Sequence, residues 1–420
     1  MAKEPKQRFL DAIKDGIGLD NELVYHIDFE DYRNFPDPFP RTTFTVKEVQ
    51  DSIERYPNPE RPGANFRWDI HGRLLTPDQP SLPGVAVVMI HGGAANEYEF
   101  LFTPDGPEKY LDLTKVAPTQ SRVGIAQHIA SLGVTVLAIS LPGHYSRNPW
   151  PPIASRKHEF VIGEPPGDPE LKNRLAVYTF RMCLEAIKVL IETNLPDYSL
   201  YIWGHSTGGE FFYLMEQYGL KNKLIGGLGF GTGMTGAMSK EFNRVASETS
   251  LEERASKFVP ITDVSRRSPE EYTETGCVGP NQPWGSAERW FELEDHRRPQ
   301  IKPHLQYLEH NGLDVVLDEV RQESGLPDDE LFICNRADLN RLRGKKMLYF
   351  VGEHDKGHWM TNAKKGLEFR REVYAARRLA QYADKMRLIV VGGLTHYGHI
   401  ESHNERLANM MVTGFKDYFP

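Results

Sequence analysis

The sequence YIWGHSTGGEFF, residues 201–212, gives the strongest indication of the fold. Apolar residues precede a Gly-His-Ser-Thr-Gly pentapeptide, and an amphipathic segment follows it. A serine with glycine two residues before it and two residues after it fits a sharp turn from a strand into a helix, because bulkier neighbours would collide with the facing backbone. The strand–turn–helix setting therefore makes Ser206 a candidate nucleophile rather than a hydroxyl in an ordinary glycine-rich loop.

Short apolar runs alternate with helical segments on both sides of this stretch. This alternation predicts an α/β fold, in which helices cover both faces of a mainly parallel sheet. We expect strands at residues 85–90, 134–140, 200–203, 224–230, 347–351 and 388–391, and helices at residues 123–132, 174–193, 209–218 and 405–418.

The chain divides into three regions. Residues 1–65 are expected to be an N-terminal leader that packs on the core or on a cap, with a helix over residues 44–56 (FTVKEVQDSIERY). Residues 66–233 and 344–420 form the predicted core. Residues 234–343 have no long apolar strand, so we interpret them as a cap inserted over the edge of the sheet where α/β proteins bind ligands.

A serine nucleophile needs a general base and an acid that orients the base. Asp355 follows the apolar run at 347–351, and His396 follows the run at 388–391. Two alternatives stand nearby, Glu353 for the acid and His399 for the base. We favour Asp355 because a shorter side chain suits a fixed imidazole partner, and His396 because it comes first after a Gly-Gly turn.

The oxyanion of a tetrahedral intermediate needs backbone N–H donors. Thr207, which follows the candidate nucleophile, is expected to supply one. The sequence HGGAAN after the first core strand is expected to supply the other from Gly93, with Gly92 and Ala94 as alternatives.

Five residues are candidate substrate contacts around this centre. Each also has a purely structural interpretation: the two tryptophans as core of the cap, for example, and the histidine as a side chain packed beneath the turn. The candidates are Gly92, His205, Tyr145, Trp284 and Trp290.

Four blocks of sequence together resemble the α/β-hydrolase superfamily. They are IHGG (90–93), SLPGHYSR (140–147), GHSTGG (204–209) and the pair GEHD (352–355) and GGLTH (392–396). The resemblance implies an eight-stranded, mostly parallel sheet with one antiparallel strand near its start, and a serine hydrolase that needs no cofactor. Ser140 and Tyr145 depart from the usual pattern of the second block, so the shape of the pocket is not carried over. A serine at position 206 argues against the branches that use aspartate there.

The predicted activity is cleavage of a carboxylic ester or lactone of an apolar or aromatic small molecule through an acyl-enzyme. Hydrolysis of an amide or C–C bond, and acyl transfer, stay open because they use the same triad. Two other classes are weighed. One is a metal enzyme built on the histidine-rich sequence HDKGH (354–358), disfavoured because Gly357 weakens a helix there. The other is a non-catalytic ligand-binding protein on the same fold.

The composition excludes several other roles. The 420 residues carry a net charge of −8, which gives no sign of a nucleic-acid-binding surface. The N-terminus has no apolar signal region, and no apolar run is long enough to span a membrane. The three cysteines form neither a disulfide framework nor a metal motif. We therefore expect a cytoplasmic protein with no metal, cofactor or membrane partner, and the sequence leaves a homodimer open.

Overall fold

The protein is described from a computed structural model. It describes residues 6–7, 9–10, 24–57, 62–92, 100–101, 123–141, 180–212, 215, 219–231, 310–312, 314–315, 318–319, 322, 339–353, 376–377, 379–394, 398–399 and 403–417. Most of the predicted cap, residues 234–343, lies outside these ranges.

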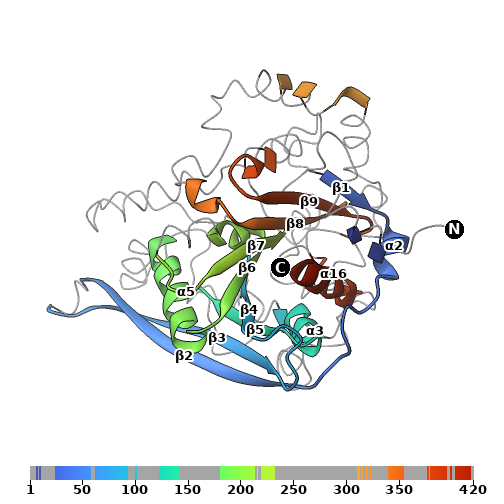
Figure 1. Ribbon diagram of the computed structural model, residues 1–420. Coiled ribbons are helices and arrows are strands. Elements are labelled where there is room, and N and C mark those ends of the chain that lie inside the picture. The colour runs from blue at the N-terminus through green and yellow to red at the C-terminus, as the bar shows by residue number, and fades with distance from the viewer. Residues whose placement is uncertain are drawn as a thin grey trace, which may run out of the picture.

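A nine-stranded sheet forms the centre of the described structure (Figure 1). The order of its strands is β1-β9-β8-β7-β6-β4-β5-β3-β2. The strands are β1 (Val24–Ile27), β2 (Phe44–Pro57), β3 (Asn65–Pro77), β4 (Val85–Ile90), β5 (Thr135–Ser140), β6 (Ser199–His205), β7 (Leu224–Phe230), β8 (Lys346–Gly352) and β9 (Lys385–Val391).

One strand of this sheet runs against the others. The strand β3 is antiparallel to both of its neighbours, β2 and β5, and every other neighbouring pair is parallel. From β2 to β9 this is the eight-stranded arrangement with an early antiparallel strand that the resemblance implied. The ninth strand, β1, pairs in parallel with β9 and was not predicted, because its four residues, VYHI, are too few to show a strand pattern.

The helix expected over residues 44–56 is wrong, because this segment is the edge strand β2. Val49 and Ile53 are its only buried residues among the described side chains of the strand. A spacing of four residues puts two side chains on one face of a helix, but it also puts them on one face of a strand, whose side chains alternate. Within the described residues, the expected leader thus contributes β1 and β2 to the core sheet and is not merely packed on it.

Helices cover both faces of the sheet (Figure 1). One face carries α5 (Phe180–Asn194), which contacts β2, β3 and β5. The other carries α3 (Ile125–Ser131) and α16 (Asn404–Asp417), which pack against each other. A short helix, α2 (Phe29–Arg33), contacts α16, and two 3-10 turns are η5 (Ser206–Glu210) and η8 (Leu339–Leu342). Within the described ranges, no helix is both long and apolar enough to cross a membrane.

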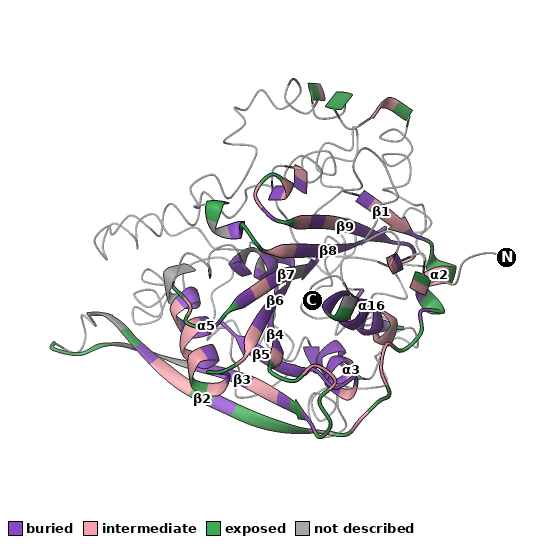
Figure 2. Ribbon diagram, in the orientation of Figure 1, coloured by how far each residue is buried: buried purple, intermediate pink, exposed green. Residues whose placement is uncertain are grey.

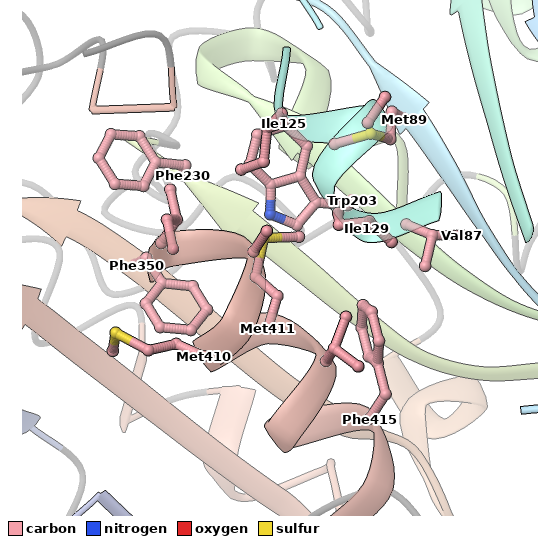
Figure 3. Packing of buried hydrophobic residues seen from close by; sticks show 14 of the residues in the cluster. Val87, Met89, Ile125, Ile129, Trp203, Phe230, Phe350, Met410, Met411 and Phe415 are labelled. Carbon is pink, nitrogen blue, oxygen red and sulfur yellow. The ribbon is translucent and has the colours of Figure 1, made fainter. Parts of the chain in front are cut away.

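The main core lies between the central strands and the α3–α16 pair (Figure 3). Trp203 of β6 is fully buried there and meets the ring of Phe100 edge-on, with 5.4 Å between the ring centroids. Tyr201, two residues earlier on the same face, stacks on Phe415 of α16 at 4.7 Å. Each such side chain contributes about 1.5–3 kcal/mol when fully buried. The strand that leads to the candidate nucleophile is therefore anchored in the core. Figure 2 shows the contrast between these buried central strands and the edge strand β2, which is largely exposed.

The segment after α2 is fastened to the core by a small polar cluster. Arg41 donates two hydrogen bonds to the carboxylate of Asp37, at 2.8 and 2.9 Å, and a third to the hydroxyl of Ser131. Asn409 of α16 also donates to Asp37, at 2.8 Å. Burial alone raises the pKa of Asp37, but the hydrogen bond and charge of Arg41 outweigh it and leave this pKa below its usual value. The cluster thus ties the N-terminal segment to α3 and α16.

Candidate active site

Ser206 occupies a strained position at the end of β6. Its φ angle is +51°, and His403 is the one other non-glycine residue with a positive φ in the described part of the chain. A side chain in this left-handed region costs about 1–2 kcal/mol, so it persists only where the surroundings enforce it. The turn η5 begins at Ser206 itself. The predicted sharp turn after an apolar strand is therefore present, and the strain falls on the serine.

The two glycines of the pentapeptide are required by close backbone contacts. A Cβ atom on Gly204 would lie 2.0 Å from the backbone nitrogen of Gly209, within the same turn. A Cβ atom on Gly208 would lie 2.1 Å from the carbonyl oxygen of Ile90, at the end of β4. Both distances are far inside van der Waals contact. The pattern that drew attention in the sequence therefore reflects how tightly the turn packs against itself and against the neighbouring strand.

The loop after β4 lies directly against this turn. The strands β4 and β6 are parallel neighbours, with Ile90 opposite Gly204. A Cβ atom on Gly92 would lie 3.3 Å from the Cβ of Ser206 and 3.0 Å from Nδ1 of His205. Gly92 is therefore next to the candidate nucleophile, where a donor loop for an oxyanion is needed.

His91 holds this loop in place. Its Nε2 accepts a hydrogen bond from the backbone N–H of Leu141, at 3.0 Å, so Nε2 carries no proton. Its Nδ1 lies 2.6 Å from the carbonyl oxygen of Gly92 and, in the tautomer that remains, donates to it. The buried imidazole thus links the end of β5 to the loop after β4. In the sequence, His91 stands only as the first residue of HGGAAN, and the local pattern carries no signal of this bracing role.

His205, predicted as a substrate contact, is buried beneath the turn. Its ring packs on the ring of His399, with 4.1 Å between centroids. His399 in turn contacts the rings of Phe100, Trp203 and Phe230, at 5.9–6.0 Å. His399, the alternative base, therefore lies in an aromatic environment below the residue that precedes Ser206.

The loops that carry the predicted acid and base leave the same edge of the sheet. The strands β6, β7, β8 and β9 are successive parallel neighbours, so their carboxyl ends meet at one edge. Ser206 follows β6, Asp355 comes three residues after β8, and His396 comes five residues after β9. The topology therefore makes the three segments start from the same edge of the sheet.

Several of the predicted residues lie outside the described residues, so their side-chain positions are not given. Thr207 is described in its backbone only, within η5. In the described ranges, no three His, Cys, Asp or Glu side chains gather as metal ligands. The predicted residues outside these ranges are Gly93, Tyr145, Trp284, Trp290, Asp355 and His396.

Comparison with known proteins gives likenesses at the level of the fold. No protein-family model matches the chain, and neither does any curated protein. Among solved structures, the chain is similar to the peroxisomal alpha-beta-hydrolase Lpx1 of Saccharomyces cerevisiae, with 12% identity over 90% of this chain and 91% of that chain and a TM-score of 0.43. A bacterial esterase is 11% identical, over 91% of this chain and 97% of that chain, with a TM-score of 0.44. A thermophilic esterase of Thermogutta terrifontis is 12% identical, over 89% of this chain and 100% of that chain, with a TM-score of 0.41.

The chain has the α/β-hydrolase fold. This assignment rests on the strand order and directions from β2 to β9 and on the strained serine after β6.

Proposed function

We propose that the protein is a serine hydrolase that cleaves a carboxylic ester or lactone of an apolar or aromatic small molecule through an acyl-enzyme. The observation that carries the proposal is the positive φ of Ser206, held between two glycines that cannot be replaced and beside Gly92. A strained serine at the carboxyl edge of a parallel sheet is the setting in which a hydroxyl is presented to substrate.

In the proposed reaction, the oxygen of Ser206 attacks the carbonyl carbon while its proton passes to the imidazole of His396. The electron pair of the carbonyl moves to its oxygen, which accepts hydrogen bonds from the N–H groups of Gly93 and Thr207. Asp355 fixes the tautomer of His396 and stabilises the imidazolium. Collapse of the intermediate expels the alcohol, which takes the proton from His396. Water then repeats the sequence and releases the acid.

Covalent labelling of the serine tests the proposal. A fluorophosphonate probe should modify Ser206, identified by mass spectrometry of the labelled peptide. Ser206→Ala should abolish labelling and lower the hydrolysis of p-nitrophenyl esters by at least about a thousandfold. Ser52→Ala, on the distant strand β2, is the matched control and should retain both. Full esterase activity in Ser206→Ala would show that the nucleophile is assigned wrongly.

The acid and the base are tested by paired variants. His396→Gln should remove ester hydrolysis, whereas His399→Gln should retain most of it if the latter ring only packs beneath the turn. Asp355→Asn should behave like the His396 variant. The reverse result for the two histidines would move the base to His399. Thermal unfolding of each variant separates lost chemistry from lost folding.

Product analysis distinguishes the other reactions that the same triad could catalyse, and probe labelling tests the non-catalytic alternative. Matched p-nitroanilides test amide cleavage, and an added alcohol acceptor tests acyl transfer, because a second ester then forms instead of the free acid. Release of an acid and a carbon fragment from a β-diketone would indicate C–C bond cleavage. Failure of the probe to label a folded protein would favour a binding protein on this fold.

A further inference from the structure

Three strands end level with one another at one side of the predicted catalytic edge. In the sheet register, Gly352 of β8 lies opposite Val391 of β9, and Val391 lies opposite Ile27 of β1. The residues that follow these three positions therefore leave the sheet side by side. They are Glu353 on the loop that leads to Asp355, the turn Gly392–Gly393 that leads to His396, and the start of α2.

Hydrogen bonds fix the Gly392–Gly393 turn from two sides. The N–H of Gly392 donates to the carbonyl of Ile27, at 2.7 Å. The N–H of Gly393 donates to a carboxylate oxygen of Glu353, at 3.3 Å, while the backbone N–H of Glu353 donates to the carbonyl of Val391, at 2.9 Å. The first turn after β9 is therefore bonded to β1 on one side and to the loop after β8 on the other.

The same turn is also confined by Phe29 at the start of α2. A Cβ atom on Gly392 would lie 2.7 Å from the backbone nitrogen of Phe29, and one on Gly393 would lie 2.6 Å from its ring. Gly393 has a φ of +78°, which a side chain would strain in addition. The turn has no room to shift toward α2, so the hydrogen bonds hold it in one place.

The carboxylate of Glu353 contacts both this turn and β1. Glu353 is buried, and its second oxygen lies 3.6 Å from Nε2 of His26 on β1. A buried carboxylate is costly unless it has partners, and two of its partners here are the N–H of Gly393 and the ring of His26. These contacts link Glu353 both to the turn after β9 and to the N-terminal strand β1.

We propose that Glu353, Ile27 and Phe29 form a clamp on the Gly392–Gly393 turn, and that this clamp positions His396 for catalysis. Glu353 is then a positioning residue, and the N-terminal strand β1, which lies beyond the eight-stranded sheet, becomes part of the support of the site. The inference rests on the proposed function for the role of His396. Because His396 comes three residues after Gly393, a displacement of the turn moves the base relative to Ser206.

Two variants of Glu353 test the clamp. Glu353→Ala removes the acceptor for the N–H of Gly393, whereas the amide oxygen of Glu353→Gln can still accept it. We expect Glu353→Ala to lower kcat for ester hydrolysis by about tenfold to a hundredfold with KM within about twofold, and Glu353→Gln to recover most of this loss. Glu48→Gln changes an exposed carboxylate on β2 and serves as the control, with wild-type kcat.

Amide hydrogen exchange of the 392–399 peptide supplies a readout that does not depend on activity. The clamp predicts faster exchange at Gly393 in Glu353→Ala than in the wild type, and near wild-type exchange in Glu353→Gln. Phe29→Ala should also speed exchange in this peptide, because it removes the opposite wall. Wild-type exchange and wild-type kcat in Glu353→Ala would overturn the clamp.

The remaining outcomes separate the clamp from the proposed function. If Glu353→Gln loses as much activity as Glu353→Ala while Gly393 stays protected, the charge of Glu353 acts on the base directly and the positioning role is wrong. If the fluorophosphonate probe labels neither the wild type nor the variants, the proposed function fails, while the exchange at Gly393 still supports or overturns the contact itself.

Discussion

His128 gives the protein a stability that depends on pH. It lies on α3, and burial, reinforced by the positive charge of Arg41, lowers its pKa from 6.5 to about 4. The unfolded chain therefore binds a proton at this residue below about pH 6.5, while the folded protein does so only near pH 4. The lowered pKa of His128 therefore makes the folded state less stable at low pH: its stability is at its full value above pH 6.5 and falls as the pH drops toward 4.

The magnitude follows from the two pKa values. A pKa of about 4 against 6.5 corresponds to a loss of about 2 kcal/mol at pH 5 and about 3 kcal/mol at pH 4. Urea unfolding of the wild type and of His128→Gln at pH 8 and pH 5 measures this loss, because other titrating groups are common to both proteins. We expect the wild type to lose about 2 kcal/mol more than the variant between these pH values. Equal losses in the two proteins would refute the reasoning.

Three further predictions concern the site and its support. Gly208→Ala should lower the free energy of unfolding by about 3 kcal/mol or more, because its Cβ would meet the backbone of β4. Gly84→Ala, strained at a φ of +71° but in open space, should lower it by about 1 kcal/mol, and urea unfolding of the two variants measures the difference. His91→Phe should lower the free energy of unfolding by about 2 kcal/mol and should lower kcat, since the backbone groups of Gly92 and Leu141 lose their hydrogen bonds; wild-type kinetics would contradict this. Arg41→Lys should cost at most about 1 kcal/mol by thermal unfolding, because Arg41 and Asp37 are both about a third exposed; a much larger loss would show that the cluster is more than a surface tie.

Much of the sheet was predictable because its central strands are buried on both faces. Residues 85–90 and 224–230 form strands with the predicted bounds, and the strands at 134–140, 347–351 and 388–391 were placed within a few residues. Strands of this kind are continuous apolar runs, which the sequence displays directly. The antiparallel strand and the helices α3 and α16 also agree with expectation.

The edges of the sheet were not predictable from the same signal. The strand β2 has two buried residues, and their spacing suits a helix as well as a strand. The strand β1 is four residues long, and pairing with β9, more than 350 residues later in the chain, makes it a strand. At an edge, the choice of structure is made by a partner that is remote in sequence rather than by local pattern.

The local sequence is enough to specify the turn at Ser206, because the need for Gly204 and Gly208 arises from contacts that any chain forming this turn after a buried parallel strand must make. It also gives the order in which Ser206, Asp355 and His396, the predicted nucleophile, acid and base, follow their strands. The contacts of His91 and Glu353 depend instead on the tertiary fold, since Leu141 and Gly393, which donate hydrogen bonds to them, lie 50 and 40 residues away. A buried polar side chain acquires its role from the backbone groups it is brought to meet, and the sequence pattern around it carries no record of them.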